Sequence, residues 1–61
     1  MKLHKGDKAE LPNGSNIIIV GEYAAHDGQA YKFRFEDETK VRKLTAWESY
    51  QVRDVTDDNE G

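Results

Sequence analysis

Between Tyr31 and Phe35, aromatic and cationic residues alternate, and an acidic turn sequence follows them. Alternation with a period of two is typical of a strand with one buried and one solvated face. The stretch YKFRFEDETKVRK therefore predicts an antiparallel hairpin. Its predicted buried face carries the apolar residues Tyr31, Phe33, Phe35 and Val41. Its predicted outer face carries four cations: Lys32, Arg34, Lys40 and Arg42.

Turn-forming residues divide the sequence before this hairpin into two more strands. The turn Pro12-Asn13-Gly14-Ser15 separates a predicted strand over residues 7–11 from a second one over residues 16–24. A two-residue loop at Asp27-Gly28 then connects the second strand to the aromatic one.

The second strand contains an uninterrupted apolar run from Ile17 to Val20. With the loop at Asp27-Gly28, Ile18 and Val20 would share the aromatic core face, and Glu22 would lie opposite Phe33. That last pairing is unfavourable, so we expect a bulge at Gly21 that turns the Glu22 side chain outward.

The loop after Phe35 decides which face the fourth strand presents. For Val41 to share a face with Phe33 and Phe35, the loop must have an odd number of residues, so residues 36–38 or 37–39 are expected to form it. The fourth strand would then cover residues 39–44.

The end of the chain predicts a short helical turn and a last strand. Thr45 and Glu48 have the spacing of a capping box, which favours one short turn, of the 3₁₀ type, over residues 45–49. Residues 50–55 would form the fifth strand. Nowhere does the sequence show an amphipathic helix of three turns, so the predicted class is all-β, a small five-stranded antiparallel barrel. The predicted core consists of Ile18, Val20, Tyr31, Phe33, Phe35, Val41, Leu44 and Val52.

The order of four meandering strands, one helical turn and a fifth strand resembles that of SH3-like small barrels. The resemblance covers residues 7–55 and rests on the segments KGDKAELPNG, YKFRFEDET and LTAWESYQV. It is nearest to the small single-domain SH3-like proteins of bacteria and their phages. The resemblance implies a domain that binds proteins or nucleic acids, since such domains are rarely enzymes.

Length and charge restrict the domain organisation of the chain further. At 61 residues the chain has room for one domain, which we place at residues 7–55 after an N-terminal extension over residues 1–6. Four of the last eight residues are acidic, and a disordered acidic tail is expected over residues 56–61. Without those eight residues the nine basic residues exceed the eight remaining acidic ones by one, although the whole chain carries a net charge of −3.

Cysteine is absent, and the longest apolar run is far too short to span a bilayer. No apolar leader segment follows the N-terminal Met-Lys-Leu-His. We therefore expect a cytoplasmic protein that does not enter the membrane.

Two surfaces are candidates for binding. The first is cationic and would take an anionic partner: Lys32, Arg34, Lys40, Arg42 and Arg53. The alternative is a solvated sheet face that discourages aggregation, and an acidic tail that screens the cations is a third interpretation. The second candidate is aromatic and apolar: Tyr23, Trp47, Tyr50, Ile17 and Ile19. The alternatives here are that the aromatic residues fill the core and that Ile17 and Ile19 lie on a strand wrapped on both sides.

Catalytic and metal-binding patterns are missing. The two histidines, His4 and His26, lack a second ligand at suitable spacing, so no metal or other cofactor is expected. No serine has a neighbouring histidine that would activate it. The sequence therefore favours a non-enzymatic binding module, monomeric or weakly dimeric, with a protein as partner. The alternatives are a nucleic-acid-binding barrel that uses the cationic face, which the acidic net charge disfavours, and a structural or accessory protein.

Overall fold

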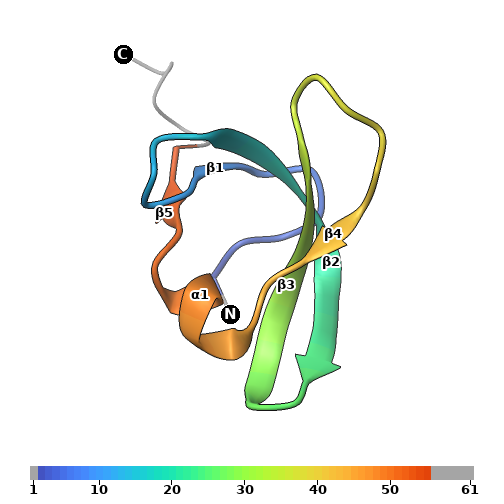
Figure 1. Ribbon diagram of the computed structural model, residues 1–61, viewed down its shortest axis with the longest axis vertical. Coiled ribbons are helices and arrows are strands. Elements are labelled where there is room, and N and C mark those ends of the chain that lie inside the picture. Colours follow the sequence, from blue (N-terminus) through green and yellow to red (C-terminus); the bar gives the residue numbers. More distant parts are fainter. Residues whose placement is uncertain (1, 56–61) are drawn as a thin grey trace.

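The computed structural model describes residues 2–55 (Figure 1). Five antiparallel strands form one sheet in the order β4-β3-β2-β1-β5, and a short helix, α1, precedes the last strand. The elements are β1 (Lys8–Glu10), β2 (Asn16–Ala25), β3 (Gly28–Phe35), β4 (Arg42–Lys43), α1 (Ala46–Tyr50) and β5 (Arg53–Asp54). The predicted all-β class with five strands and a helical turn before the last one is confirmed. The acidic segment 56–61 lies outside the described residues.

Strands β2 and β3 form the longest hairpin of the sheet. Its two-residue loop is His26-Asp27, because Ala25 pairs with Gly28. The predicted loop at Asp27-Gly28 is therefore wrong by one residue. The register shifts between Ile19 and Gly21, so a bulge is present where one was expected, with Val20 as the extra residue.

This register reverses the predicted orientation of the apolar run in β2. Ile17 pairs with Phe35 and Ile19 with Phe33, and both isoleucines are completely buried, whereas Ile18 is only half-buried. The prediction that Ile18 and Val20 fill the core is wrong, because the extra residue Val20 shifts the register by one and so places Ile17 and Ile19 on the face of Phe33 and Phe35. The binding surface predicted at Ile17 and Ile19 is wrong for the same reason.

The pairing of β4 with β3 is also shifted by one residue from the predicted register, so β4 presents the opposite face. Phe33 pairs with Arg42 and Lys32 with Lys43, so Arg42 lies on the aromatic side and Val41 is about half exposed. Arg42 is tolerated on this side because its guanidinium group packs 5.2 Å from the centre of the Phe35 ring and the side chain stays accessible to solvent. Val41 therefore does not belong to the core, and Arg42 does not belong to the outer cationic face.

The core lies between the curved sheet and the segments that close it. Its buried cluster consists of Leu3, Ala9, Ile17, Ile19, Tyr31, Phe33 and Leu44, with Leu11, Phe35 and Val52 partly buried against it. Leu3, which the sequence placed in an N-terminal extension, is thus part of the core, and its backbone N–H donates to the Tyr31 hydroxyl at 3.0 Å.

Helix α1 begins where the capping box predicts. The Glu48 N–H donates to Thr45 Oγ1 at 3.1 Å, and the Thr45 N–H donates to Glu48 Oε1 at 2.9 Å. The helix is of the α type and continues through Tyr50, which the sequence had assigned to the last strand. Strand β5 is correspondingly short, and within residues 2–55 it pairs with β1 alone.

Candidate functional site

Two large aromatic side chains project into solvent from α1. Trp47 is 66% exposed and Tyr50 is 79% exposed. Residues three apart lie on neighbouring positions of a helix surface, so the two rings belong to one patch. The inward side of the helix consists of small residues, Ala46 and Ser49. The alternative interpretation, in which Trp47 and Tyr50 fill the core, is wrong, because Ala46 and Ser49 occupy the buried positions of α1.

The carboxylate of Asp27, at the tip of the β2–β3 hairpin, fixes the start of α1. It accepts hydrogen bonds from the backbone N–H groups of Ala46 at 2.9 Å and Trp47 at 3.3 Å. The hydrogen bond from Ala46 is the main reason why the pKa of Asp27 is lower than usual. Local sequence patterns identified Asp27 only as a turn residue, since its partners lie 19 and 20 residues away.

Ser49 attaches the other end of the helix to β3. Its Oγ accepts a hydrogen bond from the Tyr31 N–H at 3.0 Å and donates one to the Thr45 carbonyl at 2.9 Å. Gly28, at the start of β3, has a φ of +132°, which favours glycine, and a Cβ there would be in ordinary contact with the Ala46 Cβ at 3.4 Å. The two exposed rings therefore stand on a helix that is held at both ends.

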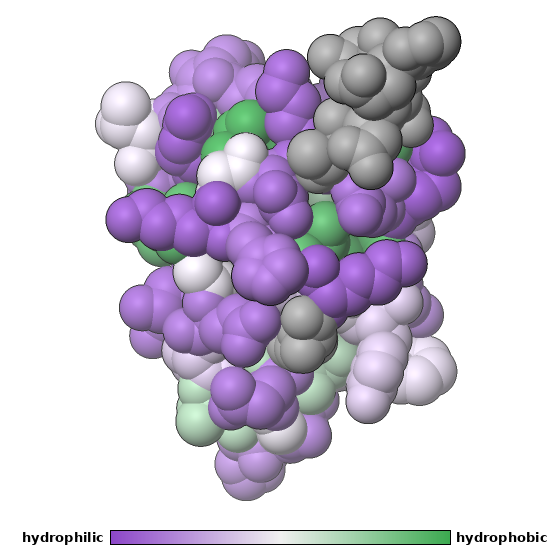
Figure 2. Space-filling view, turned by 180° about the vertical axis from the view of Figure 1, so that it is seen from behind, coloured by the Kyte–Doolittle hydropathy of each residue, from purple (hydrophilic) through white to green (hydrophobic). Residues whose placement is uncertain are grey.

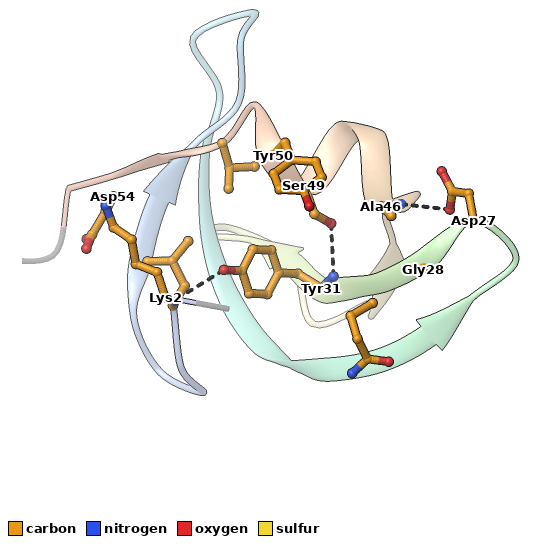
Figure 3. A pocket seen from close by; sticks show the side chains of 11 residues that line it. Lys2, Asp27, Gly28, Tyr31, Ala46, Ser49, Tyr50 and Asp54 are labelled. Carbon is orange, nitrogen blue, oxygen red and sulfur yellow. Dashed lines mark hydrogen bonds between the residues drawn. The ribbon is translucent and has the colours of Figure 1, made fainter.

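A pocket of about 490 Å³ lies beside this helix, between α1, the start of β3 and the N-terminal segment (Figure 3). Leu3, Tyr31 and Val52 supply its apolar surface, and Tyr50 lines it as well. Charged groups lie toward its two ends, with Lys2 and Asp54 at one and Asp27 at the other (Figure 3). The pocket can hold an apolar side chain and present charged groups to its surroundings.

Tyr23 does not join the aromatic patch. Its hydroxyl donates to the Leu44 carbonyl at 2.6 Å, and the Lys43 ammonium lies 5.3 Å from the centre of its ring. The pocket beside α1 includes Tyr50 but neither Tyr23 nor Trp47. The predicted group of three aromatic residues therefore separates into a pair on α1 and a half-buried tyrosine on β2.

The predicted cationic face is also divided. Arg34 Nη1 donates to the carbonyl groups of Phe35, Glu36 and Glu38 at 3.2–3.4 Å and so holds the loop after β3. Arg42 Nη2 pairs with Glu38 at 3.1 Å. Both guanidinium groups are therefore engaged with the loop between β3 and β4.

Arg53 is engaged on the opposite edge of the sheet, where Nη2 pairs with Glu10 Oε1 at 2.7 Å. Lys40 is exposed in the loop before β4. The cations that do lie together are Lys32 and Lys43, which are directly opposite one another on β3 and β4. Lys43 was not among the predicted binding residues. The predicted register of β4 placed Arg42 on this face, and the observed register places Lys43 there instead.

The surface seen from behind is mainly hydrophilic, and hydrophobic residues show there only in small areas (Figure 2). In residues 2–55, no three His, Cys, Asp or Glu residues gather as they would around a metal ion. The described part of the chain also contains no helix of the length and apolar character that a membrane span requires. No protein-family model, curated protein or solved structure matches the chain.

Proposed function

We propose that this chain is a non-enzymatic binding domain of the SH3-like kind that binds a protein partner through Trp47, Tyr50 and the adjoining pocket. The observation that carries the proposal is the exposure of these two rings on a helix fixed at both ends. Large aromatic side chains are enriched at the centres of protein interfaces, where their burial supplies much of the binding energy.

The rigidity of α1 supports this proposal. The capping box, the Asp27 carboxylate and Ser49 hold the helix before any partner arrives. A partner that covers the two rings would therefore lose little free energy in ordering this side of the interface. The pocket beside Tyr50 would accept an apolar side chain of the partner against Leu3 and Val52.

The test is affinity capture of partner proteins from a lysate with matched variants. Trp47→Ala and Tyr50→Ala should each lose the captured protein. Val41→Ala is the matched control, because Val41 is the other large hydrophobic side chain exposed in residues 2–55 and lies away from α1. Capture that survives the Trp47 and Tyr50 substitutions, or that is lost with Val41→Ala, would contradict the proposal.

Nucleic-acid binding is the second candidate, and the directly opposed Lys32 and Lys43 favour it. Two like charges side by side destabilise a sheet, and a phosphate between them would relieve the repulsion. If nucleic acid is the ligand, Lys32→Glu and Lys43→Glu should abolish binding to every sequence alike, and affinity should fall steeply with salt. An absence of DNA and RNA binding at low salt would exclude this candidate. Protein remains ahead because two lysines can displace few counterions.

A further inference from the structure

Strand β2 is ten residues long, but its outer edge is covered only at its beginning. Strand β1 pairs with residues Asn16, Ile17 and Ile18, and Gly6 and Asp7 exchange backbone hydrogen bonds with Ile19. Within residues 2–55, no strand pairs with the edge from Gly21 to Ala25 on the side away from β3. In Figure 1 this half of β2 extends beyond the body of the sheet with β3 on one side only.

The hydrogen bonds of Tyr31 show which backbone groups point to this edge. The Tyr31 N–H donates to Ser49 Oγ and its carbonyl accepts from the Leu44 N–H, so both groups point away from β2. Glu22 and Tyr31 are therefore a pair without mutual backbone hydrogen bonds, and the Glu22 N–H and carbonyl point to the open edge. By the alternation of an antiparallel ladder, the N–H and carbonyl of Ala24 point there as well.

The side chains leave this edge accessible. Tyr23 reaches over the neighbouring strands to the Leu44 carbonyl, so its ring does not cover the edge. Gly21, Ala24 and Ala25 are small, and neither proline nor lysine occurs in the segment. Natural proteins commonly protect such edges with proline, lysine or a covering loop, since unpaired strand edges bind other strands.

We propose that this edge binds a second copy of the chain, so that two β2 strands pair antiparallel about a two-fold axis at Tyr23. The outward groups of Glu22 and Ala24 lie symmetrically on either side of Tyr23, as a two-fold axis requires. Glu22 of one copy lies opposite Ala24 of the other, and these residues exchange N–H···O bonds across the axis. Gly21 lies opposite Ala25, so no like charges face each other.

This dimer is compatible with binding through α1. Helix α1 is attached to β3, on the other side of the hairpin from the proposed interface. Both copies of Trp47 and Tyr50 therefore stay accessible, and the dimer would present two binding surfaces to a partner. The dimer does not depend on that partner, so the two proposals can fail separately.

The direct test is the molecular mass of the purified chain as a function of concentration, measured by sedimentation. Ala24→Pro removes one outward N–H without removing a hydrogen bond inside the hairpin, so each dimer loses two hydrogen bonds. We expect dimerisation to weaken tenfold or more. Ala24→Ser keeps the N–H and should dimerise as the wild type does. A wild type that stays monomeric at its highest soluble concentration, or an Ala24→Pro variant that dimerises equally well, would overturn the proposal.

Hydrogen exchange gives a second measurement that needs no substitution. The amides of Glu22 and Ala24 should exchange quickly in dilute protein and slowly in concentrated protein. The amides of Gly21, Tyr23 and Ala25, which face β3, should be protected at both concentrations. Fast exchange of Glu22 and Ala24 at every concentration would contradict the proposed interface, whatever the measured mass.

Discussion

Tyr31 and Phe33 on β3 and Trp47 and Tyr50 on α1 differ completely in exposure. The first two are 3% and 5% exposed and lie in the core, whereas the other two are among the most exposed large side chains described. A domain of this size has little apolar surface to spare for solvent. The comparison indicates that the aromatic residues of β3 serve folding, while those of α1 serve another purpose, which we propose to be binding.

The largest expected effect concerns the buried side of this comparison. Phe33→Ala should lower the free energy of unfolding by ~3–5 kcal/mol, because it leaves a cavity between Ile19 and the Phe35 ring. In a small domain that loss is comparable to the whole stability. Urea denaturation followed by circular dichroism measures it, and a loss below about 1 kcal/mol would mean that Phe33 is not in the core.

The orientation of β2 can be tested with neighbouring isoleucines. Ile19→Ala should cost ~2–5 kcal/mol, whereas Ile18→Ala should cost about 1 kcal/mol or less, because Ile18 lies on the outer face opposite Arg34. The chemistry of the two substitutions is identical, so the difference reports burial alone. Equal costs, or a larger cost at Ile18, would support a ladder without the bulge, in which Ile18 and Val20 face the core instead.

A smaller effect is expected at Asp27, which connects the hairpin to α1. Its pKa is lower in the folded protein than its ordinary value of 3.8, so its ionised form stabilises the fold. That contribution is fully present above the ordinary pKa and is lost as the pH falls through the lowered one. Asp27→Asn should therefore be less stable than the wild type at neutral pH.

The same measurement at acidic pH is the control for this prediction. The difference in urea midpoint between the wild type and Asp27→Asn should vanish in acid, where the wild-type carboxyl group is protonated too. If the difference in urea midpoint is the same at all pH values, the charge of Asp27 is not the cause of the lost stability.

The sequence predicts the elements of this fold better than the faces they present. Alternation on β3 places Tyr31 and Phe33 correctly, and the spacing of Thr45 and Glu48 locates α1. The register depends on single residues in bulges and loops. The extra residue Val20 in β2 exchanges Ile18 for Ile19, and one residue before β4 exchanges Arg42 for Lys43.

The candidate site was only partly predictable from the sequence. Trp47 and Tyr50 are recognisable as candidates from residue type, but a local pattern cannot tell exposed rings from buried ones. Whether the two rings are buried or exposed depends on the rest of the core, which Leu3, Ile17 and Ile19 fill from other segments. The role of Asp27 depends on a contact between elements that are distant in sequence.

Trp47 is the only tryptophan of the chain, so its fluorescence tests the proposed role of α1 most directly. In the unbound protein, a soluble quencher should reach Trp47 nearly as well before unfolding in urea as after it, because the ring is 66% exposed. When a captured partner protein is added, the folded protein should become resistant to the quencher, and Tyr50→Ala should remove this protection. A ring already protected in the unbound protein, or equally quenched with the partner bound, would contradict the account.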